Sequence, residues 1–545
     1  MSIQYNEYMG MKILIMGLGL NGGGLHSALY LARRGADITV TDLRDEKTLA
    51  PSIEELETEL AKGGSRTKSS IRYVLGRHET EDFKAADIVI KNPGVRPDSP
   101  YLLSARRIET DISLFLDASP PIRLTAVTGS KGKSCIASAL HWVLKMRSEE
   151  WGMGNGEDGG SIPPPQRGTP PQRPHTSLPT PHSLLPTPYL GGNITLSPLS
   201  FLDNLNEGDD VVLELSSFQL GDLRGRMNEK TGKSLLKPRA VIISSIMPDH
   251  LNRYGTMGAY IADKRVIYQG QEKEDLLVTE NDLWGQSFRS ESRARSLIYS
   301  EKVLPDEFAG GWIDESSNCG LVRVGKYAHR DSAHCSSSIE VVPASLLVPG
   351  KHQKKNLLAA ALALIDLGLP AEFIRENLGS FKGIEHRLEY FFESKGVKFY
   401  NDSAATIPEA TAMAIRAFDK PPVLVCGGTD KNLDFTPLVE AWAAAMVDYA
   451  AHTSSHNSTS SHNSMKARLL LLEGSGSVKL ALMLDAAGLG YCGPFDSLDK
   501  AVEAALEIAK PGDAVVLSPG CTSFGMFTNE FDRGNQWKET VQRLA

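Results

Sequence analysis

The sequence predicts a three-domain α/β protein in which each domain has a mostly parallel β-sheet covered by α-helices. Three groups of short apolar segments, which end in turn residues and alternate with helical patterns, indicate this: MKILIMGLG, ADITVTD and ADIVIKNPG; IRLTAVTGS, DDVVLELSS and RAVIISSI; PPVLVCGGTD, ARLLLLEGS and DAVVLSPG. Such runs are typical of parallel strands buried on both faces. We expect the domains to span residues 1–121, 122–384 and 385–545.

The composition is that of an ordinary soluble protein, with 41% hydrophobic and 23% charged residues. The formal charge of −8 disfavours general nucleic-acid binding. The chain has no run of 18 apolar residues, so we expect no membrane-spanning helix. Six scattered cysteines without a CxxC pair favour reduced thiols, which predicts a cytoplasmic location.

Two segments depart from this globular pattern. Residues 161–188 hold 10 of the 30 prolines, which remove backbone donors and fix φ, so an extended insertion is expected. Residues 452–464 read HTSSHNSTSSHNS, and their polar composition predicts a solvated loop rather than a metal site. Neither segment is expected to carry chemistry.

The first apolar segment leads into a glycine-rich turn. Gly17, Gly19 and Gly22 form a G-x-G-x-x-G pattern between a predicted strand and a predicted helix. This pattern lets phosphates approach the backbone at a helix N-terminus, and Asp42 and Arg44 after the next strand could bind a sugar hydroxyl and a phosphate. A turn without any ligand remains the alternative, and the pattern does not distinguish NAD from another nucleotide.

The second group contains a shortened phosphate loop. TGSKGKS, residues 128–134, follows a predicted strand and opens a predicted helix. Its backbone N–H groups and Lys133 would bind the phosphates, and the Ser134 hydroxyl would bind Mg²⁺. Val127 stands where the full Walker pattern has glycine, so a chance match is the alternative.

Two further metal-ligand candidates follow neighbouring strands. Glu214 ends the apolar run VVLE, where a carboxylate is costly unless it is paired or bound to metal. Asp249 and His250 follow the predicted strand AVIISSIMP at its carboxyl end, where α/β sheets bind ligands. A buried ion pair for Glu214 and a structural role for His250 are the alternatives.

These segments together resemble one family. TGSKGKS, ELSSFQL, MPDHLNRYGTMGAYIADKRVIY, HR at 386–387 and NDSAATIPEA are similar to the Mur ligases of peptidoglycan synthesis, over nearly the whole chain. LSPGCTSFGMFTNEFDRG and NDSAAT are most similar to the branch that adds D-glutamate. The resemblance implies a Rossmann-like N-terminal domain, a central phosphate-loop ATPase domain and a Rossmann-like C-terminal domain.

The resemblance also implies roles for matching positions. The catalytic set would be Lys133, Glu214, His250 and Lys264. ATP would contact Gly129, Ser130, Lys131, Gly132, Lys133, Ser134, Cys135, Asn356, Arg387 and Asp402. Substrates would contact Leu20, Asn21, Asp42, Arg44, Asn193, Thr406, Lys431 and Ser523. Mg²⁺ would be held by Ser134, Glu214, His250 and Lys264, the last as a carbamate.

The implied reaction is ATP-dependent amide formation. ATP would phosphorylate the carboxylate of UDP-N-acetylmuramoyl-L-alanine, and the D-glutamate amine would attack the acyl phosphate to give a tetrahedral intermediate. Two Mg²⁺ ions would neutralise the phosphates and the carboxylate. A monomeric cytoplasmic enzyme of cell-wall synthesis, and so of cell shape and division, is expected.

The sequence departs from the family pattern at four positions. Lys131 replaces the usual Asn, Cys135 replaces Thr, Gln353 replaces Asn, and Ala404 replaces a lysine that would face an anion. Four rival functions stay open: another Mur ligase or a folylpolyglutamate synthase, an NAD-dependent oxidoreductase, a phosphate-loop switch or motor, and a binding scaffold that has lost catalysis.

Overall fold

The computed structural model describes residues 8–20, 22–62, 71–152, 186–193, 196–323, 338–454 and 467–545. Asn21 and most of the predicted insertion 161–188 and loop 452–464 lie outside the described residues. The chain packs as two compact units. The first comprises Met1–Trp312, Val322–Ile339 and Ala359–Ile374, and the second comprises Ile313–Leu321, Glu340–Leu358 and Arg375–Ala545.

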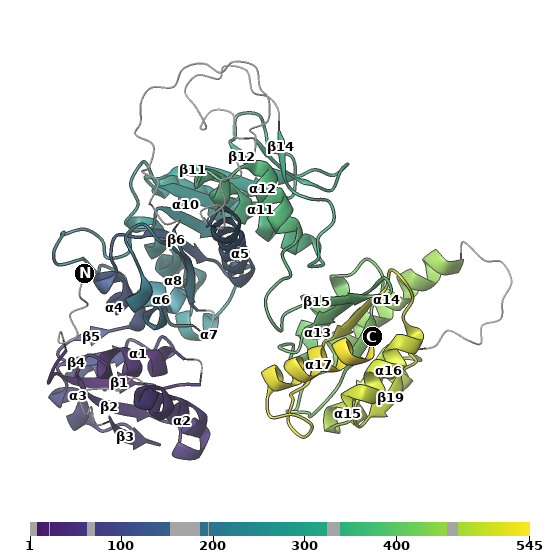
Figure 1. Ribbon diagram of the computed structural model, residues 1–545, viewed down its shortest axis with the longest axis horizontal. Helices are drawn as coiled ribbons and strands as arrows, with labels where there is room; N and C mark the ends of the chain where they lie inside the picture. The colour runs from purple at the N-terminus through teal and green to yellow at the C-terminus, as the bar shows by residue number, and fades with distance from the viewer. Residues whose placement is uncertain are drawn as a thin grey trace, which may run out of the picture. The chain divides into compact units, whose positions relative to one another are not determined.

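The first sheet has the strand order β3-β2-β1-β4-β5, with all pairs parallel. In chain order, its strands are β1 (Lys12–Met16), β2 (Asp37–Asp42), β3 (Ile71–Leu75), β4 (Ile88–Lys91) and β5 (Ile108–Glu109), and its helices are α1 (Gly23–Ala32), α2 (Glu46–Lys62), α3 (Thr80–Ala85) and α4 (Asp111–Ala118). Alternate β1 residues enter different cores, with Ile13 packing beside α1 and Leu14 beside Phe83 of α3. Helices therefore cover both faces, as the sequence predicted (Figure 1).

The second sheet has nine strands in the order β14-β13-β12-β11-β10-β9-β6-β8-β7. In chain order they are β6 (Arg123–Thr128), β7 (Pro188–Gly192), β8 (Asp210–Glu214), β9 (Ala240–Ile243), β10 (Leu276–Glu280), β11 (Arg295–Ser300), β12 (Gly310–Ile313), β13 (Gly320–Arg323) and β14 (Ile339–Val342). The accompanying helices are α5 (Lys133–Gly152), α6 (Ser217–Asp222), α7 (Leu251–Tyr254), α8 (Met257–Lys264), α9 (Val266–Gln269), α10 (Leu283–Glu291), α11 (Lys351–Asp366) and α12 (Ala371–Gly379). Strand β6 pairs in parallel with β8 and β9, so the carboxyl ends of these three strands share one sheet edge.

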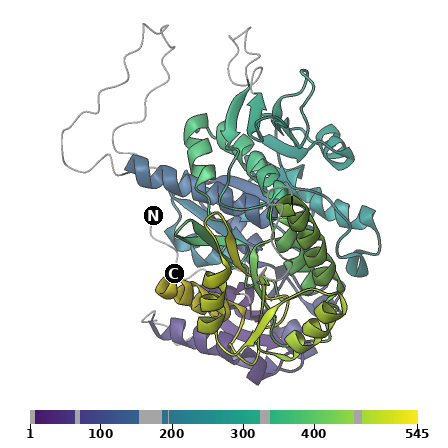
Figure 2. The ribbon, with the colours of Figure 1, turned by 90° about the vertical axis from the view of Figure 1, so that its right-hand side faces the viewer.

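The third sheet lies in the second unit and has the order β15-β16-β20-β17-β18-β19. Its strands are β15 (Glu389–Ser394), β16 (Val397–Asn401), β17 (Val423–Cys426), β18 (Leu469–Leu472), β19 (Cys492–Phe495) and β20 (Ala514–Leu517), and its helices are α13 (Pro408–Arg416), α14 (Thr436–Ser454), α15 (Ser475–Ala486), α16 (Leu498–Ile508) and α17 (Glu530–Leu544). Leu424 and Val425 enter opposite cores, one with α14 and one with α16. Only the β15–β16 pair is antiparallel among the described pairs, and helices flank both sides (Figure 2).

The predicted fold class is confirmed, because three mostly parallel sheets are each covered by helices. The predicted boundaries near residues 121 and 385 stay predictions. Within the described residues, no helix has both the length and the apolar character needed to cross a membrane.

Candidate functional site

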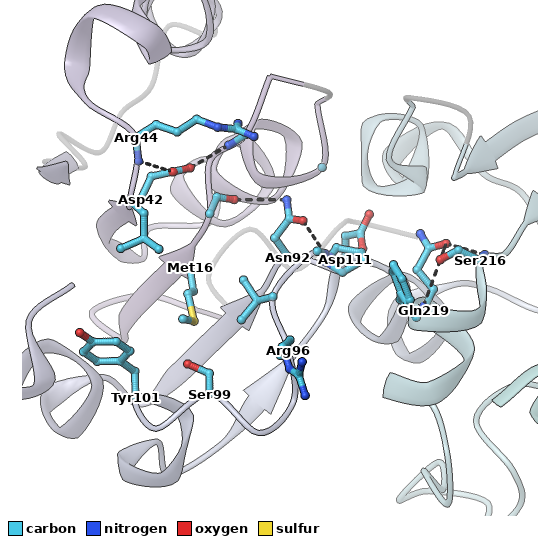
Figure 3. A pocket seen from close by; sticks show the side chains of 18 of the residues that line it. Met16, Asp42, Arg44, Asn92, Arg96, Ser99, Tyr101, Asp111, Ser216 and Gln219 are labelled. Atoms are coloured by element: carbon cyan, nitrogen blue, oxygen red, sulfur yellow. Dashed lines mark hydrogen bonds between the residues drawn. The ribbon is translucent and has the colours of Figure 1, made fainter. Parts of the chain in front are cut away.

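A cleft of about 830 Å³ lies in the first unit, where the glycine-rich turn after β1 faces the end of β7 and the start of α6 (Figure 3). Gly22 begins α1 with φ 80°. A Cβ at Gly24 would lie 2.2 Å from the Gly17 carbonyl oxygen, so glycine is required for the strand and helix to approach this closely. The exposed Leu20 lines the same cleft.

Asp42 shapes the turn from the end of β2. Its carboxylate accepts from the Gly19 N–H at 3.2 Å and from the Arg44 N–H at 2.9 Å. Both Asp42 and Arg44 line the cleft, as their predicted role requires (Figure 3). Because Asp42 is only 7% exposed and accepts two backbone hydrogen bonds, it orders the turn that lines the cleft.

The opposite wall comes from residues around β7 and α6. Asn193 lines the cleft and donates from Nδ2 to Glu214 Oε1 at 2.9 Å, which links the cleft to the edge of the second sheet. Ser216 and Gln219 form a capping box that starts α6, and both side chains line the cleft (Figure 3). Sequence reasoning missed these two residues, although the S-S-F-Q spacing is a recognisable helix-start signal.

The phosphate loop joins β6 to α5 as predicted. Gly129 and Gly132 have φ values of 143° and 92°, which L side chains rarely adopt. A Cβ at Gly129 would lie 1.9 Å from the Ser244 hydroxyl. Among the other loop positions, Lys131 is exposed, Lys133 and Ser134 are half-buried at the start of α5, and Cys135 is buried.

The segment after β9 supports this loop. The Ser130 N–H donates to the Ser245 carbonyl at 2.9 Å, and the Ser244 hydroxyl donates to the Lys131 carbonyl at 2.6 Å. The Ser130 hydroxyl also donates to the Met247 carbonyl at 2.9 Å. The predicted strand AVIISSIMP is therefore too long: β9 ends at Ile243 because the following backbone turns to hold the loop.

Glu214 has the surroundings of a metal ligand. It is 1% exposed at the end of β8, and its Oε2 is buried without a hydrogen-bond partner among the described residues. A buried carboxylate oxygen without a partner destabilises the folded state unless a cation binds to it, so Glu214 is suited to bind Mg²⁺. His250 begins α7 with φ 53°, and its side chain is 49% exposed. No cluster of three or more His, Cys, Asp or Glu residues in the described ranges is arranged to hold a metal by itself.

Lys264 lies under the phosphate loop and is 1% exposed. Its Nζ donates to the Gly129 carbonyl at 2.7 Å and lies 4.7 Å from the centre of the Tyr260 ring. Burial, with the nearby Lys133 charge, lowers the pKa of Lys264 to about 7. Lys264 is therefore not a solvated surface lysine, and the amine is available in its neutral form near neutral pH.

In the second unit, Asp402 follows β16. Its two oxygens accept from the Leu388 N–H at 3.0 Å and from the Ser518 hydroxyl at 2.6 Å. Burial raises the pKa of Asp402 to about 7. Arg387 is exposed on a turn between His386 and Leu388, which have φ values of 63° and 46°. Strained non-glycine residues of this kind concentrate at functional sites, which favours a ligand contact for Arg387.

The loops after β16, β17 and β20 meet because these strands are neighbours in the third sheet. The Gly520 N–H donates to the Ala405 carbonyl at 2.9 Å, which brings the half-buried Thr406 close to this loop. Thr429 and Thr522 form an antiparallel bridge. The structure thus brings together the loops that carry Thr406, Lys431 and Ser523.

Side chains in this region differ in exposure. Lys431 is exposed, with its Nζ 4.7 Å from the centre of the Phe524 ring, whereas Ser523 is 4% exposed. Ala404 is half-buried and presents no charge. Asn356 lies on α11, 8% exposed, and donates to Gln353 Oε1 at 3.4 Å.

Known proteins are similar to this chain along its length. Family profiles match the Mur ligase MurD-like N-terminal domain at residues 11–113, the Mur ligase middle domain at 127–364 and the Mur ligase glutamate ligase domain at 386–521. The UDP-N-acetylmuramoylalanine--D-glutamate ligase of Treponema pallidum (strain Nichols) is 35% identical, with 98% of each chain covered. The protein of the same name from Borreliella afzelii (strain PKo) is 34% identical, with 100% of each covered.

A solved structure supports the fold alone. UDP-N-acetylmuramate-alanine ligase from Thermotoga maritima matches with a TM-score of 0.51 and 19% identity, covering 98% of this chain and 100% of that chain.

Proposed function

This chain belongs to the Mur ligase family, and we infer that it catalyses ATP-dependent addition of D-glutamate to UDP-N-acetylmuramoyl-L-alanine in peptidoglycan synthesis. Relatives that carry this enzyme name match the chain over its whole length. The structural observation that carries the proposal is the group at one edge of the second sheet: a phosphate loop, a carboxylate with an orphaned oxygen and a buried lysine that reaches the loop backbone.

The proposed roles of the residues follow from their positions. The cleft binds the UDP-sugar through its glycine-rich turn, with Asp42 and Arg44 as polar contacts. Lys133 neutralises charge on the γ-phosphoryl group of ATP while this group passes to the substrate carboxylate and ADP leaves. The acyl phosphate so formed releases phosphate, a stable leaving group, when the amine attacks its carbonyl carbon. Asn356, Arg387 and Asp402 stay predicted ATP contacts.

Glu214, His250, Ser134 and a modified Lys264 are the residues that would hold Mg²⁺. Bound Mg²⁺, in two ions by this proposal, supplies positive charge next to the phosphates and the reacting carboxylate. The orphaned Glu214 oxygen supports this assignment. A monomeric enzyme in the cytoplasm belongs to the same proposal, and sedimentation of the purified protein tests its oligomeric state.

The test of the proposed function is ADP release across a panel of substrates. UDP-N-acetylmuramoyl-L-alanine with D-glutamate should give rapid ADP release and a ligated product of matching mass. L-Glutamate, meso-diaminopimelate or UDP-N-acetylmuramate should give little. A preference for another amino acid would favour the rival Mur ligases, ADP release without acceptors would favour a switch or motor, and no turnover would favour a scaffold.

The low pKa supports carbamylation of Lys264. The neutral amine attacks CO₂, one C–N bond forms, and the amine proton leaves to solvent, which gives a carbamate anion. This anion could bind Mg²⁺, whereas a lysine ammonium would repel it.

Carbamylation predicts a pH-dependent requirement for CO₂. At a pH below the Lys264 pKa of about 7 the amine is mostly protonated, and the protonated form cannot react with CO₂. Carbamylation also releases a proton, so a lower pH shifts this equilibrium further toward the free amine. The dissolved CO₂ concentration for half-maximal activity should therefore rise more than about tenfold from pH 7 to pH 6. Initial rates in degassed buffers with defined CO₂ measure this, and an unchanged CO₂ requirement would contradict it.

The amino-acid pocket predicts a role for Lys431. D-Glutamate carries two carboxylates, and Ala404 removes the lysine that the family has at that position, so Lys431 bears more of the anion recognition. Lys431→Ala should raise the KM for D-glutamate by roughly tenfold or more, with little change for ATP, as expected for loss of one charge-assisted contact.

Steady-state kinetics against each substrate measure this split. Lys500→Ala, which removes an exposed lysine paired with Asp496, is the matched control and should leave both constants unchanged. Ala404→Lys should be tolerated or should lower the KM for D-glutamate. An unchanged KM in Lys431→Ala would mean that the pocket lies elsewhere.

A further inference from the structure

One arginine side chain connects a helix beside the second sheet to a loop of the first sheet at the cleft. Arg253, on α7, donates from its two terminal nitrogens to the Gly94 carbonyl at 3.1 Å and to the Val95 carbonyl at 3.3 Å. Gly94 and Val95 belong to the loop after β4, which lines the cleft. The planar guanidinium thus holds two consecutive carbonyls of a ligand-binding loop, a geometry that lysine cannot reproduce.

The same guanidinium stacks on Phe218. The Arg253 Cζ atom lies 3.8 Å from the centre of the Phe218 ring, and the His250 ring centre lies 4.9 Å from it. Phe218 also lines the cleft. His250 starts the single turn of α7 that carries Arg253, so a movement of Arg253 reaches His250 through both the ring and the backbone.

A buried ion pair fixes the other side of this loop. Lys91 Nζ lies 2.8 Å from Asp222 Oδ2, with the side chains 3% and 9% exposed. Lys91 also donates to the Val95 carbonyl at 2.9 Å. Because unpaired charges are costly at such burial, the pair is expected to stay closed. The Val95 carbonyl is therefore held by two cations, and Arg253 is the one connected to His250.

We infer that Arg253 is a positioning residue that couples binding of the UDP-sugar in the cleft to the placement of His250 as a ligand of the Mg²⁺–nucleotide. This inference rests on the proposed function. A ligand that contacts the loop after β4 orders the Gly94 and Val95 carbonyls, which fixes the guanidinium and so the Phe218 ring against which His250 packs. Coupling of this kind is reciprocal, so Mg²⁺–nucleotide must tighten UDP-sugar binding by the same factor.

The test is calorimetric binding of UDP-N-acetylmuramoyl-L-alanine with and without Mg²⁺ and a non-hydrolysable ATP analogue. In the unmodified protein the Kd should fall by roughly fivefold or more when the analogue is present, the lower end of usual coupling factors. Arg253→Met keeps an apolar side chain against Phe218 but removes the two guanidinium donors to the Gly94 and Val95 carbonyls. This variant should bring the ratio of the two Kd values close to one. Should this variant not fold, Arg253→Lys retains the charge without the paired donors and should also lose most of the ratio.

Arg226→Met is the matched control. Arg226 also joins the two sheets, donating to Glu109 Oε2 at 2.6 Å and to the Ile108 carbonyl at 2.6 Å, but neither residue lines the cleft. This variant should keep the coupling ratio. The inference is overturned if the unmodified protein shows no difference between the two Kd values. It is also overturned if both Arg253 variants keep the ratio of these Kd values, or if Arg226→Met loses the ratio to the same extent.

The ligation assay separates this result from the proposed function. If the unmodified protein forms the ligated product but the Arg253 variants keep the ratio of the two Kd values, only the inference about Arg253 is wrong. Absence of any D-glutamate ligation by the unmodified protein would remove the proposed function itself.

Discussion

Lys133→Ala is expected to reduce ligation by at least ~10²–10³, while ATP-independent binding of the UDP-sugar persists. Lys133 is the first residue of α5, at the junction of the phosphate loop and the helix, and its Nζ donates to the Ser130 carbonyl at 3.0 Å. By the proposed function, Lys133 would supply the main side-chain charge for the β/γ-phosphates. Removing it leaves the loop backbone intact but the developing charge uncompensated.

The measurement is ADP release under saturating substrates, with thermal unfolding as the check on folding. Lys145→Ala is the control, because Lys145 lies on the same helix, is 55% exposed and pairs with Glu149. It should keep near-normal turnover. Comparable activity in Lys133→Ala would remove the phosphate-loop assignment, and a lowered melting temperature in that variant alone would point to a structural role.

Features that are local in the sequence could be predicted. The glycine-rich turn and Asp42 lie where β1 and β2 of the first sheet end, and the phosphate loop lies where β6 of the second sheet ends. In each sheet, parallel strands place their carboxyl ends at one edge. For the same reason the loops carrying Thr406, Lys431 and Ser523 could be expected to meet, and the Gly520–Ala405 hydrogen bond and the Thr429–Thr522 bridge are the contacts that join them.

Features that depend on tertiary packing could not be predicted. The resemblance placed Lys264 in the site, but the pattern of α8 alone does not reveal that its side chain lies under the phosphate loop, because a helical lysine is usually exposed. The early end of β9 follows from hydrogen bonds of Ser244 and Ser245 to residues more than a hundred positions away. The role of Arg253 could not be predicted either, because its hydrogen-bond partners are backbone carbonyls, which every sequence contains, and its stacking on Phe218 depends on the fold.

The hydrogen bonds of Asp402 add a structural role that its motif does not indicate. The matching position predicts contact with ATP, and this stays a prediction; one carboxylate oxygen accepts from the Leu388 N–H and the other from the Ser518 hydroxyl. These bonds join the backbone just after the exposed Arg387 to the end of β20. A residue that matches a family motif can thus shape the loop beside a predicted ligand contact, as well as contact the ligand itself.

Lys264→Ala is expected to be nearly inactive, with a rate loss of at least ~10². The buried amine lies 2.7 Å from the Gly129 carbonyl, and its pKa of about 7 leaves a large neutral fraction for reaction with CO₂. Truncation removes the carbamate that the proposal assigns to Mg²⁺ and opens space under the loop. Formate, acetate or propionate could then place a carboxylate there, so millimolar concentrations of one of them should restore part of the rate.

The rescue distinguishes a missing anion from a damaged fold. Lys264→Met fills the space with an apolar chain and should be equally inactive but insensitive to carboxylic acids, whereas Lys273→Ala, at an 85% exposed lysine, should be unaffected. Mass spectrometry of the native protein under CO₂ should show an added 44 Da, the mass of CO₂, that is absent from both Lys264 variants. Full activity of the unmodified protein after rigorous CO₂ removal would show that the plain lysine suffices, in which case the anion assigned to this position has no part in catalysis.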